Sequence, residues 1–313
     1  MKLNPSTTTF VFPGQGSQAV GMGRELAAAY PIARQTFEQA DSILGIAMSV
    51  MMWEGPESDL NDTLNTQPAL YIHSVAAVRV FSDLYPDFKP AALAGHSLGE
   101  LSALTAAGAL SFEAGLRLVR TRGELMKTAG GRNPGGMAAI LNLDLARLEQ
   151  VCAQASAPEE PVQVANDNCP GQVVISGAKA AVERAMDGSK AAGAKRAIPL
   201  AVSIAAHSQL MASIQDEWDS AVEAAGIVNP AVPVVGNVHA RAMASADELR
   251  SDIKAQMQSR VRWTESIRLL AGQGVATFAE MGAGSVLIGL IRRIVPAAAG
   301  FLLGAPSDFA GLE

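Results

Sequence analysis

Short apolar runs alternate with longer helical patterns along most of this sequence. The first apolar run is Thr8–Phe12, which Pro13 and Gly14 end, and a second covers residues 91–95. Between them, residues 24–44 and 68–84 carry apolar side chains at helical spacing. Strands that alternate with helices favour a mostly parallel sheet buried on both faces. The sequence therefore predicts an α/β fold.

The order of elements changes at the breaker Arg-Asn-Pro-Gly-Gly of residues 132–136. Beyond it we expect strands at 137–141, 162–166, 173–176 and 196–202, and helices at 143–156 and 178–192. This βαββαβ order is the ferredoxin-like unit. We therefore predict a small subdomain at 133–203 inserted into a large domain of residues 1–132 and 204–313. The large domain then resumes with expected helices at 209–225, 246–258, 264–271 and 286–294 and strands at 232–237 and 277–280.

Composition narrows the class of protein but identifies no ligand. Of the 313 residues, 49% are hydrophobic and 17% are charged, which excludes a disordered or coiled-coil chain. The net charge is −6, so we expect neither nucleic acid nor a membrane as a partner. Cys152 and Cys169 form no metal-binding pair. With no export signal in view, we expect a cytoplasmic protein with reduced thiols and no metal.

The segment Gly95-His96-Ser97-Leu98-Gly99 matches the G-x-S-x-G pattern of a nucleophile elbow. It stands between an expected strand and an expected helix, where such a turn exposes a serine hydroxyl. The helix that follows also directs backbone N–H groups toward an oxyanion formed by attack. This context predicts an α/β-hydrolase-like large domain with Ser97 as its nucleophile. The alternative is an ordinary turn whose serine caps the helix.

A serine nucleophile needs a general base, and the sequence holds four histidines. His96 adjoins Ser97 and cannot fold back onto it, and His73 lies within an expected helix among apolar residues. His207 precedes an expected helix, whose dipole would lower the imidazole pKa and favour the neutral base. His239 follows another expected strand and stays an alternative, although we favour His207.

Arg122 is informative because of its position on the helix that we expect from Ser111 to about Ala129. It falls on the apolar stripe of that helix. A buried guanidinium is costly unless an anion meets it, and its planar fork suits a carboxylate. Two explanations stay open, namely a substrate carboxylate and an internal ion pair with a buried Asp or Glu.

Residues 14–19, Gly-Gln-Gly-Ser-Gln-Ala, formally match a dinucleotide-binding pattern. A dinucleotide fold would need a second strand ending in an acid about 20 residues further on. Residues 24–44 instead read as one helical pattern, so we reject that interpretation. A glycine-rich turn beside the nucleophile is better suited to supplying an oxyanion N–H.

Taken together, these segments resemble the malonyl-CoA:acyl carrier protein transacylases, acyltransferases of fatty-acid and polyketide synthesis, over nearly the whole chain. The matching segments are FPGQGSQ at 12–18, GHSLGE at 95–100, RGELM at 122–126, PGQVVISG at 170–177, GAKRAIPL at 193–200 and AHSQLM at 206–211. The resemblance implies S-malonyltransferase activity. In it, a malonyl group passes from malonyl-CoA to the phosphopantetheine thiol of acyl carrier protein by a ping-pong mechanism.

The resemblance also implies a role for each matching residue. Ser97 would be acylated, His207 would act as base and then acid, and Arg122 would bind the malonyl carboxylate. Two further groups complete the implied site. The N–H groups of Gln15 and Leu98 would form the oxyanion hole. Gln256 would orient His207 through its carbonyl oxygen, so a dyad rather than a triad is expected.

Partners follow from the same resemblance. We expect acyl carrier protein and CoA as partners, a monomeric chain, and no bound cofactor. Carrier proteins are acidic, so a chain of charge −6 needs a local basic patch. The candidates are Lys195, Arg196, Arg292 and Arg293, although a solvated face is the commoner fate of such pairs.

Two positions depart from the family pattern. Leu101 stands where an aromatic residue is frequent, and Ala206 stands where a larger residue precedes the histidine. We therefore expect a roomier acyl pocket that admits methylmalonyl. Other functions stay open: a polyketide-type acyltransferase with broader substrate choice, a serine thioesterase or esterase, or a non-catalytic module that docks carrier proteins. Arg122 distinguishes the esterase from the transferase, because a hydrolase of neutral esters has no use for it.

Overall fold

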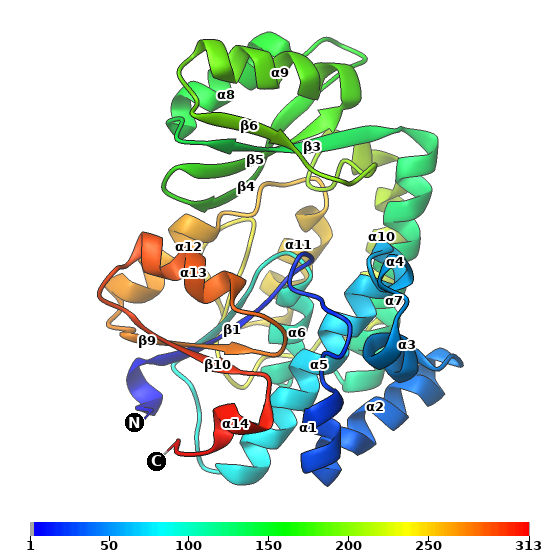
Figure 1. Cartoon of the computed structure of the whole chain (residues 1–313), viewed down its shortest axis with the longest axis vertical. Coiled ribbons are helices and arrows are strands. Elements are labelled where there is room, and N and C mark those ends of the chain that lie inside the picture. Colours follow the sequence, from blue (N-terminus) through cyan, green and yellow to red (C-terminus); the bar gives the residue numbers. More distant parts are fainter. Residues whose placement is uncertain (1–2, 313) are drawn as a thin grey trace.

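The computed structural model describes residues 3–312, which form two separate sheets (Figure 1). The strands of the larger sheet are β1 (Thr8–Phe12), β2 (Ala92–Gly95), β7 (Val234–Val235), β8 (Ala242–Met243), β9 (Thr277–Met281) and β10 (Ala299–Leu303). They lie in the order β10-β9-β1-β2-β7-β8, and every neighbouring pair except β7 and β8 is parallel. The predicted α/β class is confirmed.

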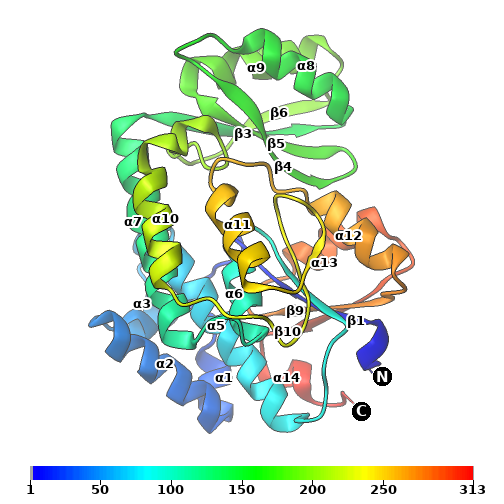
Figure 2. The same ribbon diagram turned by 180° about the vertical axis from the view of Figure 1, so that it is seen from behind.

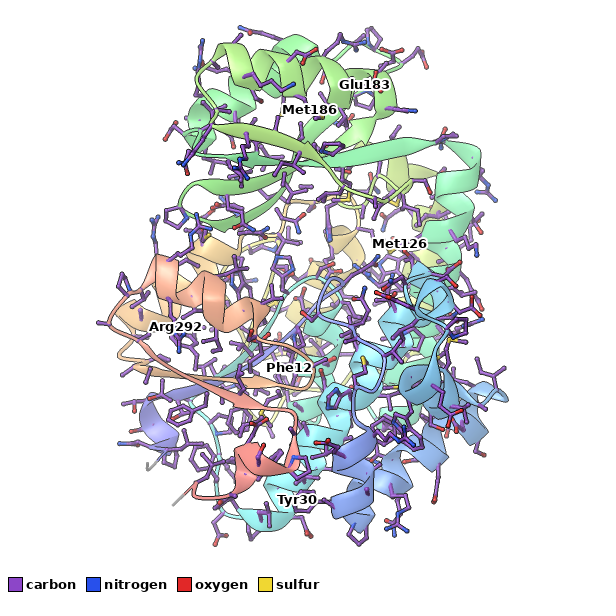
Figure 3. The ribbon with its side chains drawn as sticks, viewed as in Figure 1. Phe12, Tyr30, Met126, Glu183, Met186 and Arg292 are labelled. Carbon is purple, nitrogen blue, oxygen red and sulfur yellow. The ribbon has the colours of Figure 1, made fainter. Side chains whose placement is uncertain are left out.

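Strand β1 shows why this sheet is buried on both faces. Phe10 and Phe12 pack in a core with side chains of α5 (Thr63–Leu84) and α6 (Gly99–Ala106). Val11 points the other way, into a second core with α12 (Trp263–Gly272) and α13 (Val286–Ile294). A parallel strand covered by helices on both sides is apolar throughout. Phe12, at the end of β1, lies in the middle of the molecule (Figure 3).

The smaller sheet has the predicted ferredoxin-like order. Its strands are β3 (Gly135–Leu141), β4 (Val162–Cys169), β5 (Gln172–Ala178) and β6 (Arg196–Pro199). They are antiparallel in the order β4-β5-β3-β6, with α8 (Leu145–Ala155) and α9 (Lys179–Ala191) on the outer face (Figures 1 and 2). The other face is turned toward the larger sheet. The exact division at residues 133 and 203 stays a prediction.

Two expected helices have different bounds because of prolines. Residues 24–44 form α1 (Arg24–Ala29) and α2 (Pro31–Leu44), since Tyr30 is extended and a proline favours the first position of a new helix. Helix α5 begins at Thr63 and contains Pro68 in its interior. Pro68 has no N–H to offer the Leu64 carbonyl, which instead accepts a hydrogen bond from Arg120 Nη1 at 3.2 Å.

Other elements differ in length or were not foreseen. The helix expected at 209–225 is a 3₁₀ helix, η2 (Gln209–Ile214), followed by α10 (Gln215–Ala224). Strands β8 and β10 were not predicted, and β7 is only two residues long. The remaining elements are η1 (Pro5–Thr7), α3 (Met48–Glu54), α4 (Glu57–Leu60), α7 (Phe112–Arg132), α11 (Ala246–Gln256) and α14 (Pro306–Phe309).

Candidate active site

Ser97 lies on the turn between β2 and α6 with a left-handed backbone, φ 52°. The glycines on either side allow this turn. A Cβ on Gly95 would lie 1.9 Å from the Gly99 carbonyl carbon, and one on Gly99 would lie 2.1 Å from the Phe12 oxygen. Neither distance is possible, so the chain can pass so close to itself only with glycine at both positions. The strand–turn–helix geometry expected around Ser97 is therefore present, and its role as nucleophile stays a prediction.

Asn237 holds this turn from the neighbouring end of β7. Its Oδ1 accepts a hydrogen bond from the Ser97 N–H at 2.7 Å, and its Nδ2 donates to the Gly95 carbonyl at 2.6 Å. The asparagine is buried, so both ends of its amide are satisfied by the elbow. Sequence analysis did not single out Asn237. The available signal was a polar residue at the carboxyl end of an expected central strand, where sites of parallel sheets gather.

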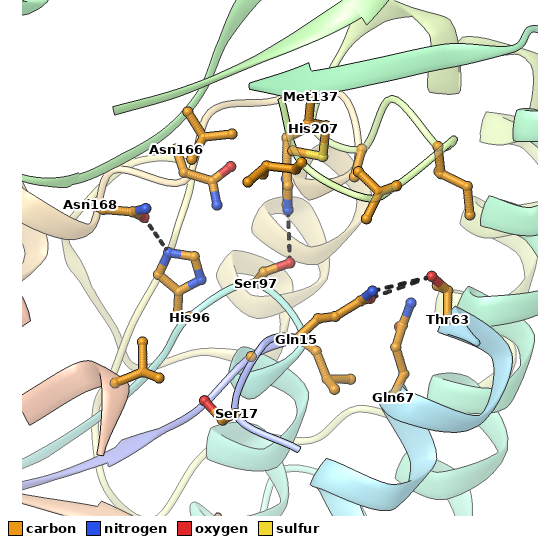
Figure 4. A pocket seen from close by; sticks show the side chains of 18 of the residues that line it. Gln15, Ser17, Thr63, Gln67, His96, Ser97, Met137, Asn166, Asn168 and His207 are labelled. Atoms are coloured by element: carbon orange, nitrogen blue, oxygen red, sulfur yellow. Dashed lines mark hydrogen bonds between the residues drawn. The ribbon is translucent and has the colours of Figure 1, made fainter. Parts of the chain in front are cut away.

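His207 meets Ser97 directly (Figure 4). Its Nε2 lies 2.7 Å from Ser97 Oγ. Its Nδ1 lies 2.9 Å from the Gln256 carbonyl oxygen and 3.1 Å from that of Ser259. Both oxygens can only accept, so Nδ1 carries the proton and Nε2 is free to take one from the serine. Within residues 3–312, the hydrogen-bond partners of the ring are the Ser97 hydroxyl and these two carbonyl oxygens.

His239, the alternative base, lies elsewhere. Its Nδ1 is 2.8 Å from the Asp252 carboxylate, and half of its side chain is exposed. His96 also turns away from Ser97, with Nε2 2.8 Å from Asn168 Oδ1. Of these three histidines, His207 alone contacts Ser97.

Burial sets the charge of His207. Desolvation, and then the nearby Arg122 guanidinium, lower the pKa of His207 to about 3. The imidazole is therefore neutral at physiological pH, as a general base must be. The direction of this shift agrees with the sequence prediction, but its cause is burial beside a cation rather than a helix dipole.

Arg122 lies on α7 with only 2% of its surface exposed. Its Nη2 donates to Ser97 Oγ at 3.1 Å and to Gln256 Oε1 at 2.9 Å. Its Nη1 donates to Gln67 Oε1 at 2.8 Å. All of these acceptors are neutral, and Arg122 forms no salt bridge within the described chain. The internal ion pair considered above is therefore not formed among the described residues, and the substrate carboxylate stays a prediction.

Burial lowers the pKa of Arg122 to about 10, so the guanidinium keeps its charge at neutral pH. Its Nε has no hydrogen-bond partner within residues 3–312. A buried cation with neutral neighbours and a spare donor is a site for an anion. Gln67, which sequence analysis also missed, fixes one side of the guanidinium from α5.

The two expected oxyanion donors lie beside the serine. Gln15 and Leu98 both line the same cavity as Ser97. Figure 4 shows Gln15 beside Ser97. Their backbone N–H groups donate to no acceptor within residues 3–312. Leu98 stands at the N-terminal end of α6, where N–H groups have no partner inside the helix. The Gln15 side chain contacts Thr63, with 3.4 Å between Nε2 and Oγ1.

The cavity above Ser97 has a volume of about 310 Å³ and is lined from both sheets. Met137, Ala139 and Val174 of the smaller sheet face the elbow across it. Ala206 lines the cavity, so its small side chain leaves room there. Leu101 is fully buried in α6 and is not among the lining residues. Only one of the two departures from the family pattern therefore touches the acyl space.

The four candidate docking cations are exposed, at β6 and at the end of α13. Figure 3 shows Arg292 on α13. Arg293 donates to Gln172 Oε1 at 2.7 Å and to the Pro170 carbonyl at 2.8 Å. Because Gln172 lines the cavity, Arg293 is linked to its rim.

A serine on a strand–turn–helix elbow, a neutral imidazole in contact with it and unpaired N–H groups beside it define a site for nucleophilic acyl transfer. Comparison with known families agrees. Residues 9–300 match the family model described as the acyl transferase domain, and the chain belongs to that family. Among the residues described, no helix could span a membrane.

Curated relatives are named more narrowly. The malonyl CoA-acyl carrier protein transacylase of Haemophilus influenzae is 47% identical over 285 residues, 91% of each chain. That of Bacillus subtilis is 45% identical over 291 residues, covering 92% of this chain and 90% of the relative. Both sequence identities are high enough that these proteins share one fold with this chain.

Solved structures of similar proteins also match this chain over nearly its whole length. An acyl carrier protein S-malonyltransferase from Vibrio cholerae superposes with a TM-score of 0.94 at 43% identity, covering 97% of this chain and 98% of that one. A malonyl-transacylase in complex with a type II PKS acyl-carrier protein superposes with a TM-score of 0.92 at 42% identity, covering 96% and 97%. The predicted family is confirmed.

Proposed function

We propose that this chain transfers a malonyl group from malonyl-CoA to the phosphopantetheine thiol of an acyl carrier protein, through an acyl-enzyme on Ser97. The observation that carries the proposal is the contact of one serine oxygen with two groups. His207 Nε2 lies 2.7 Å from Ser97 Oγ, and Arg122 Nη2 lies 3.1 Å from it. The first group activates a nucleophile and the second selects a carboxylated acyl group.

In the first half-reaction, His207 takes the hydroxyl proton as Ser97 Oγ attacks the thioester carbon. The developing oxyanion would be bound by the N–H groups of Gln15 and Leu98. Collapse of the tetrahedral intermediate breaks the carbon–sulfur bond, and His207 returns its proton to the departing CoA thiolate. The Gln256 carbonyl, 2.9 Å from Nδ1, would keep the imidazole in the required tautomer.

In the second half-reaction the carrier protein's thiol gives its proton to His207 and attacks the acyl-enzyme. The new thioester forms as the Ser97 oxygen leaves and recovers the proton, so the enzyme returns unchanged. Nothing is oxidised or reduced, and the chain needs no cofactor of its own in this scheme. The pantetheine arms arrive with CoA and with the carrier protein.

Arg122 would bind the malonyl carboxylate through its planar fork. The same cation keeps the resting imidazole neutral but also weakens it as a base, because it opposes a positive charge on His207. A bound malonyl carboxylate would offset that effect. Proton uptake by His207 would therefore become easier once the correct substrate is present.

An acidic carrier protein would meet this chain of charge −6 at a local basic surface. We place that surface at Arg196, Arg292 and Arg293, with Lys195 beside them. Arg293 carries most of the argument because its contact with Gln172 connects it to the cavity rim. We keep the monomeric state as part of the proposal.

Intact-mass measurement after mixing with malonyl-CoA tests the proposal. Wild type should gain the mass of one malonyl group, and Ser97→Ala should gain none. Addition of phosphopantetheinylated carrier protein should remove the adduct and load the carrier. If the adduct forms but only free malonate is released, the chain is a thioesterase. If wild type forms no adduct, the chain is instead a non-catalytic module that docks carrier proteins.

A further inference from the structure

Glu100 is a buried carboxyl group that the proposed mechanism does not use. It follows the elbow on α6 and has no exposed surface. It faces the equally buried Asp252 of α11. Burial, and then the Asp252 carboxylate, raise the pKa of Glu100 well above its usual range. The neutral form of Glu100 is therefore favoured, and its carboxyl group faces the Asp252 carboxylate.

Glu100 has two further neighbours. The Asn237 N–H donates to Glu100 Oε1 at 3.4 Å, and the side chain of Gln256 contacts the other oxygen. Gln256 Nε2 donates to Glu100 Oε2 at 2.5 Å and to the Ser97 carbonyl at 3.0 Å. At the opposite end of the same amide, Oε1 accepts from Arg122 Nη2 at 2.9 Å. One buried amide thus contacts the Ser97 backbone carbonyl, the Arg122 guanidinium and the Glu100 carboxyl group.

The orientation of this amide matters because Arg122 has only donors to offer. A Gln256 side chain turned by 180° would present its own N–H groups to the guanidinium. Two acceptors on the other side prevent that, namely the Ser97 carbonyl and Glu100. Asp252 keeps Glu100 in place and is itself held by the N–H groups of Val238 and His239, at 3.1 Å and 3.3 Å.

We propose that Glu100 is a positioning residue which fixes the Gln256 amide and, through it, the placement of Arg122 over Ser97. This inference rests on the proposed malonyl transfer. It assigns Glu100 to selection of the acyl group rather than to proton transfer. The base would be unaffected, because His207 is held by backbone carbonyl oxygens rather than by the Gln256 side chain.

Two substitutions test this role. Glu100→Gln keeps an acceptor for Gln256 and supplies an N–H to Asp252 in place of the carboxyl proton. Glu100→Leu removes the acceptor. The measurements are kcat and KM for malonyl-CoA and acetyl-CoA, together with the unfolding midpoint. We expect Glu100→Gln to keep the malonyl-over-acetyl ratio of wild type. In Glu100→Leu we expect that ratio to fall about tenfold, mainly through KM for malonyl-CoA.

A Glu100→Leu protein that loses both activities in proportion to its folded fraction would show a merely structural role and overturn the inference. If Glu100→Leu does not fold, Glu100→Gln decides alone, since loss of selectivity in a folded protein would mean that the acceptor is not what matters. A wild-type chain that takes no malonyl group would instead refute the proposed function.

Discussion

Arg122 Nη2 lies 3.1 Å from Ser97 Oγ, so the cation and the nucleophile are in hydrogen-bond contact before any substrate arrives. A substrate that engages both must carry its carboxylate very close to its thioester carbon. A malonyl group, with one methylene between the two, satisfies this requirement. Longer diacids would have to fold back or displace the arginine.

Replacement of Arg122 by alanine should remove selection for the carboxylate. We expect malonyl transfer to fall at least about a hundredfold, because charge-assisted hydrogen bonds to a buried group are lost. Acetyl transfer should rise, since the neutral acyl group no longer faces an unpaired cation. Acyl-enzyme formation from the two CoA esters measures the ratio. Arg117→Ala is the matched control, as Arg117 is exposed on the same helix and paired with Glu113. An unchanged ratio in Arg122→Ala would make Arg122 purely structural.

The pH profile of kcat/KM should lack the fall at acidic pH that an ordinary histidine base would produce. The pKa of His207 is lowered to about 3, so the base stays neutral as the pH falls from 8 to 5. Acylation needs that neutral form, and kcat/KM for malonyl-CoA, which reports the free enzyme, should be flat over this range. A histidine with pKa of about 6.5 would lose about thirtyfold by pH 5. Stopped-flow acylation with circular dichroism as a folding check distinguishes the two, and a limb near 6.5 would refute the assignment.

Asn237→Ala should loosen the elbow without touching the substrate. The change leaves the Ser97 N–H and the Gly95 carbonyl without their partner. We expect the free energy of unfolding to fall by about 1–3 kcal/mol and kcat to fall with KM little changed. Urea denaturation and steady-state kinetics measure the two effects. Wild-type kcat in the variant would show that the turn holds its shape without the asparagine.

Gly99→Ala should prevent the elbow from closing. The added methyl would lie 2.1 Å from the Phe12 carbonyl oxygen, which cannot move away without disturbing β1. We expect a loss of at least about 3 kcal/mol in unfolding free energy. Gly289→Ala is the control, because a methyl group there meets nothing within 4 Å on a helix. That variant should be neutral or more stable by up to about 1 kcal/mol. Urea denaturation measures both variants. Equal unfolding midpoints for Gly99→Ala and Gly289→Ala would contradict the packing argument.

Ala206 predicts tolerance of one extra methyl on the acyl group. Ala206 lines the cavity, so methylmalonyl-CoA should be used within the roughly 10–200-fold range that one methyl is worth. Ala206→Leu should lower the use of methylmalonyl relative to malonyl. Parallel rates on the two CoA esters give the answer. A far larger preference for malonyl in wild type would end the idea of a roomier pocket.

The residues that sequence analysis identified are those with a local signature. Ser97 is marked by the glycines around it, and Arg122 by an apolar stripe in which a charge is out of place. The βαββαβ order could be predicted because each element has its own periodicity of apolar residues. Proline changed the bounds of two helices, since a proline can begin a helix or be tolerated inside one when another donor reaches the freed carbonyl.

The residues that sequence analysis missed act across long separations. Asn237 reaches Ser97 from 140 positions away, and Glu100 meets Gln256 across 156. No periodicity or spacing rule joins such positions, because the contact exists only after the sheet has formed. The cause of the His207 pKa shift was unpredictable for the same reason, as burial beside Arg122 depends on tertiary packing.

The neutral surroundings of Arg122 have a consequence for turnover. Its guanidinium loses its hydration shell when the chain folds and is held by amide and hydroxyl groups from then on. If Arg122 binds the substrate as proposed, each incoming carboxylate would meet a cation that is already buried and oriented. The free energy needed to remove water from the arginine therefore lowers the stability of the folded protein. It does not lower the affinity for substrate.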